Sequence, residues 1–327
     1  MKVFVTGGAG YVGSHCVRAL CAAEHEVVVF DDLRSGHREA VDGRASLVVA
    51  DLLDPGALDA ALDAGFDAVM HFAGSIDVGE SVAEPLLYYQ NNVGGSLALL
   101  EGMRRREICS IVFSSTCATY GMPARVPIAE DCPQQPISPY GRSKLAVEWA
   151  LRDSATAWGL GSTSLRYFNA AGASSDGTIG EAHAPESHLI PLVLQVALGT
   201  RAQIKLFGTD YPTRDGTCVR DYVHVEDLAS AHVAALERQV TGEARAFNLG
   251  VGRGATVKEI VACARKVTGH AIPAVEDERR PGDPPELLAD PALARGQLDW
   301  RPRHTEIGAI VASAWRWHSA HPRGFAG

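Results

Sequence analysis

A glycine-rich turn close to the start of the chain constrains the fold most strongly. Residues 3–5 (Val-Phe-Val) form a short apolar run typical of a buried strand, and Gly-Gly-Ala-Gly-Tyr-Val-Gly follows at residues 7–13. A helical pattern then covers residues 13–23. Glycines in this position permit a tight turn and let the backbone approach a pyrophosphate, which the amides at the helix N-terminus bind. We therefore predict a dinucleotide-binding loop, with cofactor contacts at Gly7, Gly10, Tyr11, Val12 and Gly13.

The first half of the chain alternates short apolar runs with longer helical patterns. The predicted strands cover residues 3–5, 27–30, 47–49, 68–71 and 111–113, and the predicted helices include 13–23, 86–106 and 140–158. Strand and helix in alternation, joined by right-handed crossovers, indicate a doubly wound parallel sheet. The fold class we predict is α/β with a Rossmann-type sheet.

The pattern changes after residue 169, where loops rich in Gly, Ser and Pro cover 170–185 and 208–216. A chain of 327 residues is long enough for two domains. We predict a dinucleotide-binding domain at 1–168 and a smaller mixed α/β substrate domain at 169–327, with a segment near 218–236 returning to the first. Residues 228–236 and 257–267 are predicted helices, and the charged run 276–280 is a predicted loop.

Charge and cysteine content exclude several classes of protein. The formal net charge is −9, from 39 acidic and 30 basic side chains, which argues against a nucleic-acid or anionic-membrane partner. The first apolar run is too short for an export signal, and no apolar stretch approaches the roughly 18–20 residues of a membrane span. Seven cysteines without a Cys-x-x-Cys pair favour reduced thiols and a cytoplasmic location. No close Cys and His cluster has ligand spacing, so we expect no metal site.

Acidic residues at the end of the second predicted strand favour one dinucleotide over the other. Asp31 and Asp32 stand about twenty residues after the glycine loop, where a carboxylate accepts from the adenosine ribose and repels a 2′-phosphate. NAD is therefore preferred to NADP, although Arg34 keeps the preference from being absolute. Further cofactor contacts are predicted at the carboxyl ends of the third and fourth strands, at Asp51, Leu52, Phe72, Ala73 and Gly74.

A tyrosine and a lysine four residues apart suggest a base. Tyr140 and Lys144 lie about one helical turn apart, and an ammonium within about 4–6 Å lowers the pKa of a phenol by one to three units. Such a pair also occurs by chance on many helices. However, the fifth strand leads into hydroxyl residues from Ser114 to Thr116, at the edge of the sheet where the glycine loop lies. We expect Thr116 to meet Tyr140 there.

Taken together, these features resemble the extended short-chain dehydrogenase/reductase family, and within it the branch that epimerises carbon 4 of UDP-hexoses. The matching motifs lie at residues 6–15, 71–74, 78–81, 91–93, 165–169, 221–225 and 246–250. The resemblance extends over essentially the whole chain.

The resemblance implies a reaction as well as a fold. Enzyme-held NAD⁺ takes a hydride from carbon 4 of the hexose while Tyr140 removes the proton of the 4-hydroxyl. The resulting 4-keto sugar rotates about its bond to the diphosphate and receives the hydride on its other face. This step interconverts UDP-glucose and UDP-galactose. By the same resemblance, Lys144 holds the nicotinamide ribose and lowers the pKa of Tyr140, and Thr116 bonds to the 4-oxygen. A homodimer is also implied.

The resemblance adds further site residues. Cofactor contacts are implied at Asn92, Ser114, Tyr140, Lys144 and Tyr167. Substrate contacts are implied at Thr116, Tyr140, Asn169, His188, Leu189, Phe207, Arg220, Tyr222, Arg280, Asp283 and Leu287. Without the resemblance, Arg220 beside Asp221 is equally an ion pair and Phe207 equally a core residue.

Three positions depart from parts of the family. Ile76 stands where some members have a lysine, and His188 stands where others have an asparagine. Leu287 is intermediate between the tyrosine that restricts the hexose pocket and the small residue that admits N-acetylated sugars. We predict UDP-glucose and UDP-galactose as the main substrates.

Several other functions stay open. A 4,6-dehydratase needs an acidic pair after the strand-five threonine, where this chain has Cys117 and Ala118. An epimerase of UDP-N-acetylhexosamines, an epimerase or decarboxylase of UDP-uronic acids, and a non-catalytic dinucleotide sensor are further alternatives. The apolar helical stretches 86–100 and 146–158 are either dimer surfaces or faces that pack on the sheet.

Overall fold

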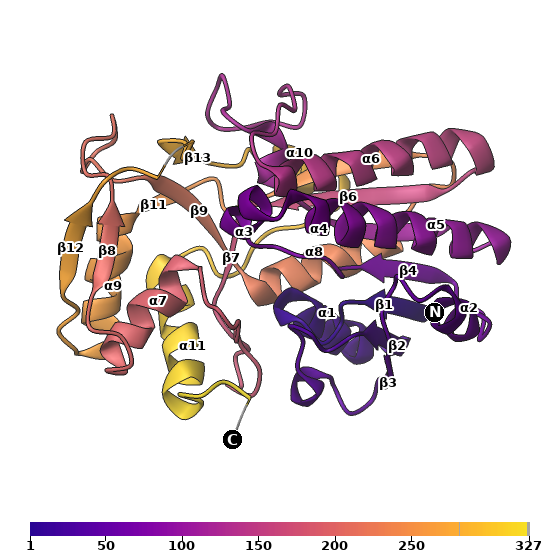
Figure 1. The fold of residues 1–327 in the computed structure, drawn as a ribbon, viewed down its shortest axis with the longest axis horizontal. Helices are drawn as coiled ribbons and strands as arrows, with labels where there is room; N and C mark the ends of the chain where they lie inside the picture. Colours follow the sequence, from indigo (N-terminus) through magenta and orange to yellow (C-terminus); the bar gives the residue numbers. More distant parts are fainter. Residues whose placement is uncertain (281, 326–327) are drawn as a thin grey trace.

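Seven parallel strands form the centre of the larger of two lobes in the computed structural model, which describes residues 1–280 and 282–325 (Figure 1). Their order is β10-β6-β5-β4-β1-β2-β3, and every neighbouring pair is parallel. The strands are β1 (Lys2–Thr6), β2 (Glu26–Asp31), β3 (Ser46–Val49), β4 (Ala68–His71), β5 (Ser110–Thr116), β6 (Gly161–Tyr167) and β10 (Ala244–Leu249). Each of the five predicted strands lies within an observed one, and the predicted Rossmann-type sheet is confirmed.

Helices cover both faces of this sheet because successive strand residues point to opposite sides. In β1, Val3 and Val5 pack into one core with α1 and α8, whereas Phe4 packs into the other with α2, α5 and α6. The helices of the larger lobe are α1 (Tyr11–Ala22), α2 (Pro55–Leu62), α3 (Val78–Ala83), α4 (Pro85–Tyr88), α5 (Gly95–Arg105), α6 (Pro139–Trp158), α8 (Val225–Glu237) and α10 (Ala292–Gln297). Two 3₁₀ turns accompany them, η1 (Arg38–Ala40) and η3 (Cys117–Tyr120).

The helix predicted at 86–106 is not one regular helix. A π-helical segment, η2 (Tyr89–Gly94), separates α4 from α5. Asn92 lies in this segment, where its side chain accepts a hydrogen bond from the Ser75 amide at 2.7 Å and donates one to the Ser143 hydroxyl at 3.0 Å. Segments of this type often mark functional sites, and this one holds Asn92 between the loop after β4 and α6.

Local signals define both ends of α6. Ser138 caps the N-terminus by accepting a hydrogen bond from the Gly141 amide at 3.1 Å, and Pro139 takes the first helical position, where no amide partner is needed. The helix ends at Gly159, which adopts a left-handed conformation at φ 79°. These ends place Tyr140 in the first turn of α6, beside the carboxyl end of β5.

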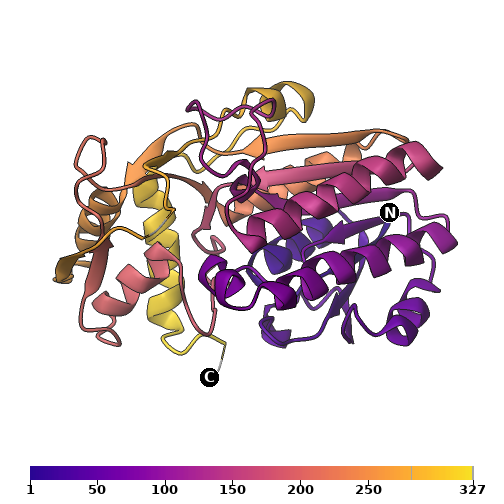
Figure 2. The ribbon, with the colours of Figure 1, turned by 45° about the horizontal axis from the view of Figure 1, so that its top comes forward.

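In the described residues, the smaller lobe contains two short sheets and three helices, and it lies beside the larger lobe in Figures 1 and 2. Its elements are β7 (Asn169–Ala171), α7 (Leu189–Ala197), β8 (Ile204–Phe207), β9 (Val219–His224), β11 (Gly254–Thr256), α9 (Val257–Thr268), β12 (Ala274–Asp277), β13 (Glu286–Leu287) and α11 (Ile307–Ala320). Strand β9 pairs with β7, β11 and β13, and β8 pairs with β12. The prediction of a loop at 276–280 is wrong for Glu276 and Asp277, because β12 aligns these charged residues beside the apolar residues Leu206 and Phe207 of β8.

The chain crosses between the lobes more than once. After β9 in the smaller lobe, α8 packs on α1, and β10 then forms the edge of the larger sheet beside β6. The larger sheet therefore takes residues as far as 249 along the chain. The domain boundaries given above remain a prediction. Among the described residues, no helix combines the length and apolar character needed to cross a membrane.

Candidate active site

The glycine loop has the shape that a pyrophosphate site requires. Gly7 has φ +69°, and a side chain there would clash with the backbone of Ala73. A side chain on Gly13 would clash with the carbonyl of Gly7, so the start of α1 lies directly against the loop. Gly10 is the N-cap of α1, and no side chain among the described residues caps it. A Cβ on Gly10 would meet only the Gly7 carbonyl, at 3.4 Å, so the open amides of the first turn suit an anionic ligand.

Asp31 connects this loop to the end of β2. One carboxylate oxygen accepts from the Ala9 amide and the other from the Leu33 amide, both at 2.9 Å. Burial raises the pKa of Asp31 from its usual value. Asp32 instead pairs with Arg34 at 2.6 Å, and the same guanidinium contacts Asp51 at 2.8 Å. The two neighbouring aspartates thus differ: Asp31 orders the loop, whereas Asp32 lies in a partly exposed charge network.

Tyr140 and Thr116 meet at the carboxyl end of β5. Burial raises the pKa of Tyr140 to about 12, and the neighbouring Thr116 side chain opposes that rise. Thr116 is 6% exposed and also accepts a hydrogen bond from the Ala118 amide at 3.1 Å. The structure therefore brings together the phenol and the hydroxyl that sequence reasoning placed side by side.

Lys144 lies one turn further along α6 and is almost fully buried. Its ammonium donates to the Ser114 carbonyl at 3.0 Å and lies 5.0 Å from the centre of the Phe113 ring. Burial lowers the pKa of Lys144 to about 8. Burial of the phenol dominates the pKa of Tyr140 in this structure, and the Lys144 ammonium is directed at Ser114 and Phe113. The lowering of the Tyr140 pKa by Lys144 therefore stays a prediction.

Several predicted cofactor residues surround Lys144. The Ser114 hydroxyl and the Tyr167 hydroxyl are 2.5 Å apart. A Cβ on Gly74 would lie 3.0 Å from the Asn92 side-chain oxygen and 3.5 Å from the Lys144 ammonium. Two other predicted residues face the core instead: the Phe72 ring packs 4.8 Å from the His232 ring, and Leu52 is buried under α2 and α5. Only the backbone of Phe72 and of Leu52 is then available at the sheet edge.

The predicted substrate residues of the smaller lobe gather around β9. Arg220 forms an ion pair with Asp283 and faces Leu287 across the β9–β13 pairing. Tyr222 is opposite Asn169 in the β7–β9 pairing. Leu287 also packs against the hydrophobic cluster that contains Cys117 and Phe168, so it lies between the smaller lobe and the end of β5.

The remaining predicted substrate residues fall into two places. The Arg280 guanidinium stacks 4.2 Å from the centre of the Phe207 ring, and the Arg280 carbonyl accepts from the Asp283 amide at 3.3 Å. Leu189 packs into the core of the smaller lobe. His188 is directed at two carboxylates, Glu181 at 2.9 Å and Glu186 at 3.0 Å. Burial opposes charging of this imidazole, but the two carboxylates raise the pKa of His188 to about 11.

Sequence reasoning missed a buried ion pair behind the site. Glu148 of α6 and Arg166 of β6 pair at 2.6 Å, with side chains 3% and 4% exposed. The Ser115 hydroxyl donates to Glu148 at 2.5 Å, and Arg166 donates to the Tyr120 hydroxyl at 2.7 Å. This network joins β5, β6 and α6 beneath Tyr140. The only signal for this pair in the sequence is that Glu148 and Arg166 are charged residues within a helix and a strand that are otherwise largely apolar or small.

The glycine loop, the acidic residue after β2 and the buried Tyr-Lys pair define a dinucleotide-dependent enzyme of the short-chain dehydrogenase/reductase class. The model of the NAD dependent epimerase/dehydratase family matches residues 3–250, and the chain belongs to this family. The predicted family and its use of NAD are thereby confirmed.

Relatives and solved structures agree over the full length. The chain is 50% identical over 327 residues to the UDP-glucose 4-epimerase of Lacticaseibacillus casei, covering 99% of each. A UDP-glucose 4-epimerase from Brucella ovis in complex with NAD is 46% identical, with TM-score 0.92 and coverage of 96% of this chain and 97% of that one. The enzyme from Bifidobacterium longum in complex with NAD⁺ and UDP is 36% identical, with TM-score 0.95 and coverage of 99% and 100%.

Proposed function

We propose that this chain is a UDP-glucose 4-epimerase that interconverts UDP-galactose and UDP-glucose on a bound NAD. The observation that carries the proposal is the buried Tyr140 phenol, which lies near the Thr116 hydroxyl at the sheet edge that also carries the glycine loop. The full-length relatives with this printed name support the same activity.

Each residue of the pair has a distinct proposed part in the reaction. When bound, NAD⁺ supplies the acceptor for the hydride from carbon 4 and returns the same hydride. The Thr116 hydroxyl would hold the 4-oxygen of the hexose, and the ionised Tyr140 oxygen would take the 4-hydroxyl proton as the carbon–oxygen double bond forms. The Lys144 ammonium and the positive charge of the nicotinamide would favour this ionised form of Tyr140. The same tyrosine returns that proton when the hydride is added to the other face. No net oxidation results, and proton transfer of this kind contributes roughly 10²- to 10⁴-fold to the rate.

Lys144 is proposed to act on the cofactor side of this pair. Its ammonium already faces the Ser114 carbonyl, next to the Ser114–Tyr167 hydrogen bond and the Asn92 side chain. A cation there suits the hydroxyls of a nicotinamide ribose. Gly74 lies close to the Asn92 side chain and the Lys144 ammonium, so a larger side chain at this position would crowd both groups.

The nucleotide half of the substrate is proposed to bind along β9 and the loop before β13. Arg220 is the natural partner for a diphosphate, because a planar guanidinium forms paired hydrogen bonds to phosphate oxygens. Arg280 stacked on Phe207, together with Asp283, supplies a second charged group in the same loop. Leu287, between this lobe and Cys117, is proposed to border the hexose.

A substrate panel tests the proposal. The purified protein, without added NAD, is incubated separately with UDP-galactose, UDP-N-acetylglucosamine and UDP-glucuronate, and the products are separated by anion-exchange chromatography. We expect UDP-glucose from UDP-galactose as the fastest reaction. Faster turnover of either other sugar would replace the proposed substrate, and a 4-keto-6-deoxy product would indicate a dehydratase. No turnover of any sugar by a folded, NAD-containing protein would overturn the proposal.

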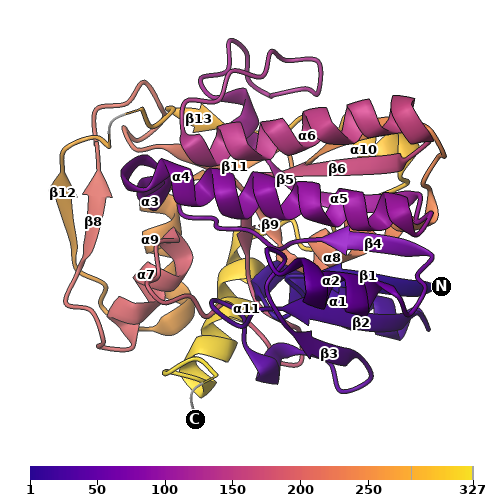
Figure 3. The same ribbon diagram turned by 45° about the vertical axis from the view of Figure 1, so that its right-hand side comes forward.

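We also propose that the chain forms a homodimer through α4, α5 and α6; in Figure 3, α4 and α5 follow one another in line and α6 runs alongside them. These helices expose large apolar side chains: Leu86 is 72% exposed, Leu97 48% and Trp149 54%. Apolar side chains of this size are usually covered by a partner when they gather on one face. Sedimentation velocity of the wild type and of a Leu86→Glu/Trp149→Glu variant tests this: we expect a dimer and a monomer respectively, and a monomeric wild type would contradict it.

A cytoplasmic location is proposed as well. All seven cysteines are free in the structure, and free thiols persist in reducing compartments. Cell fractionation followed by immunoblotting tests the location, and enrichment in an exported fraction would contradict it.

A further inference from the structure

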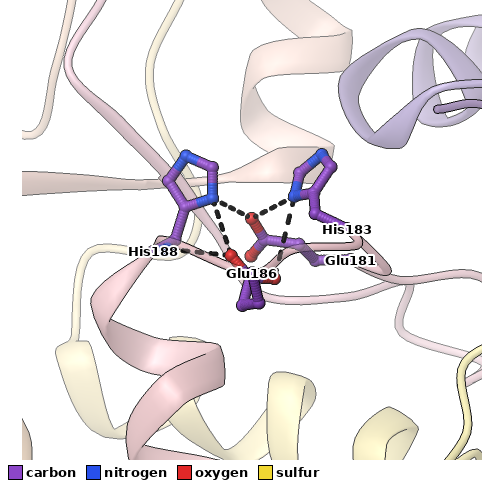
Figure 4. A group of neighbouring side chains, drawn as sticks. All are labelled: Glu181, His183, Glu186 and His188. Carbon is purple, nitrogen blue, oxygen red and sulfur yellow. Dashed lines mark hydrogen bonds and ion pairs between the residues drawn. The ribbon is translucent and has the colours of Figure 1, made fainter. Parts of the chain in front are cut away.

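Four side chains between β7 and α7 form a compact cluster: Glu181, His183, Glu186 and His188 (Figure 4). One ligand atom from each lies within 4.8 Å of those of the others. Both histidines turn Nδ1 toward the carboxylates. The four nitrogen–oxygen distances are 2.9 and 3.0 Å from His188, and 3.3 and 3.7 Å from His183.

The two carboxylates of the cluster are buried. The Glu181 side chain is 4% exposed and the Glu186 side chain 5%. Within the described residues, the ion pairs of both are with these histidines and with no lysine or arginine. Two buried anions need compensating positive charge. Either the imidazoles carry it as protonated rings, or a cation between the four groups does.

His183 favours the cation. Its Nδ1 is buried and has no hydrogen-bond partner among the described residues, although Glu181 lies 3.3 Å away, because the geometry is not that of a hydrogen bond. In a metal site, the ligand atoms are directed at the ion and not at one another. A buried nitrogen that faces two carboxylates without a hydrogen bond to either fits this arrangement.

We propose that these four side chains bind one divalent transition-metal ion of the Zn²⁺ class. Four ligands about 2.0–2.2 Å from a tetrahedral zinc lie about 3.4 Å from one another, and the four nitrogen–oxygen distances bracket that value. Two imidazoles disfavour Mg²⁺ and Ca²⁺, which prefer oxygen ligands. This cluster differs from the expected absence of a metal site, because its ligands follow the spacing Glu-x-His-x-x-Glu-x-His and not a spacing of Cys and His.

The other group of potential ligands in the described residues lacks these features. It consists of His224, Glu226 and His304, with His–Glu distances of 3.9 Å. Both ring nitrogens of His224 already have hydrogen-bond partners, the Ser313 hydroxyl at 3.0 Å and the Glu226 amide at 3.2 Å. No nitrogen of His224 is therefore left for a metal.

The cluster lies where the two lobes meet the glycine loop. The Tyr11 hydroxyl donates to the Gly172 carbonyl at 2.7 Å, and the Tyr11 ring lies 6.2 Å from the His183 ring. His37 contacts the Ala182 carbonyl at 2.9 Å. A site with four protein ligands has no open position for substrate, as in structural zinc sites. We infer that the ion stabilises the loop at residues 172–188 against the cofactor loop and takes no part in the chemistry.

Metal binding to the full-length protein tests the proposal directly. The protein is treated with a chelator, dialysed and titrated with Zn²⁺, and bound metal and the unfolding temperature are measured. We expect one ion per chain and a higher unfolding temperature with zinc. The His183→Asn variant should bind more than about tenfold more weakly, since even changes outside the ligand set weaken metal sites 10- to 100-fold.

The exposed His270 provides a matched control. His270→Asn should bind zinc as the wild type does, so equal weakening in both variants would overturn the proposal. If His183→Asn fails to fold, Co²⁺ in the wild-type protein decides the question: we expect the intense visible absorption of a tetrahedral site. No stoichiometric zinc on folded wild-type protein would show that protonated histidines balance the carboxylates, and an octahedral cobalt spectrum would exclude the proposed tetrahedral site. The readouts are independent of turnover, so the metal site and the epimerase function can fail separately.

Discussion

The two regions of the proposed active site are built differently. The catalytic edge of the larger sheet consists of side chains on regular elements, buried and bonded to backbone or hydroxyl groups, as Lys144 is to Ser114. The substrate side of the smaller lobe uses side chains on short strands and loops, held by partly exposed charges, as Arg220 is by Asp283. The Asp283 side chain is 29% exposed, whereas the Glu148 side chain behind the catalytic edge is 3% exposed.

This difference teaches which property each region contributes. Burial on rigid elements holds the proton-transfer groups in one geometry and shifts their pKa values. Partly exposed arginines instead provide charge and paired hydrogen bonds that a diphosphate can share. Changes at the catalytic edge should therefore alter turnover or stability by large factors, and changes in the smaller lobe should mainly alter KM.

The largest effect is expected from Tyr140→Phe. Removal of the phenolic oxygen eliminates the proposed base, so kcat for UDP-galactose should fall roughly 10²- to 10⁴-fold. Bound NAD, measured after protein denaturation, should be unchanged. The control is Tyr88→Phe, because the Tyr88 ring packs 6.5 Å from Tyr140 and its hydroxyl donates to Glu80. Turnover within a few-fold of wild type is expected for this control, and the same for Tyr140→Phe would contradict the assignment.

The next effect is on stability. Arg166→Leu leaves the Glu148 carboxylate buried without its partner, which should lower the free energy of unfolding by about 3–5 kcal/mol in urea titrations. Arg125→Leu breaks an exposed pair with Asp131 and should cost less than about 1 kcal/mol. A similar decrease in the free energy of unfolding for the two variants would show that burial does not make the Arg166–Glu148 pair more important for stability than the exposed pair.

Lys144 predicts a pH dependence of stability. Its pKa is about 8 in the folded protein and 10.5 when exposed. Between these values the unfolded chain binds more protons, so folding becomes more favourable as pH rises. Measured against Lys144→Met, the wild type should gain up to about 3 kcal/mol between pH 8 and 10.5. A difference between the two proteins that does not change with pH would contradict burial of the ammonium.

In the smaller lobe, Arg220→Lys should change binding more than chemistry. Lysine keeps the charge but cannot form the paired hydrogen bonds of a guanidinium, so we expect KM for UDP-galactose to rise about tenfold, or about 1.4 kcal/mol. Steady-state kinetics should show kcat within a few-fold of wild type. A larger fall in kcat than rise in KM would move Arg220 to the catalytic group.

The smallest effect is expected at the stacked arginines. Arg280 stacks on Phe207 and Arg279 stacks on Tyr211, both at 4.2 Å, which makes them a matched pair. A cation–π contact contributes about 0.5–1 kcal/mol at exposed sites, so Arg280→Leu should raise KM a few-fold. Arg279→Leu should leave KM unchanged. Equal effects would mean that general positive charge, and not the position of Arg280, attracts the substrate.

Local sequence patterns were sufficient to predict the strands and turns that carry the site. They were insufficient to predict which side chains contact one another there. The strands before Gly7, Asp31 and Thr116 were predicted because apolar runs and glycine turns are properties of neighbouring residues. The π-helical segment at Asn92 and the strand at Glu276 were missed, since they depend on pairing with distant parts of the chain. His188 was predicted as a substrate residue, yet its nitrogen faces Glu181 and Glu186.

What the sequence by itself determined is the doubly wound sheet and the edge at which the glycine loop, Thr116 and Tyr140 gather. The periodicity of each segment is local, and parallel strands bring their carboxyl ends to one edge. Only the tertiary structure decided the ionisation and the partners of these groups: Tyr140 shifted upward by burial, Lys144 directed at Ser114, and Glu148 paired with Arg166. Desolvation and Coulomb energies depend on distances between residues that are far apart in the chain, and the order of the residues does not contain those distances.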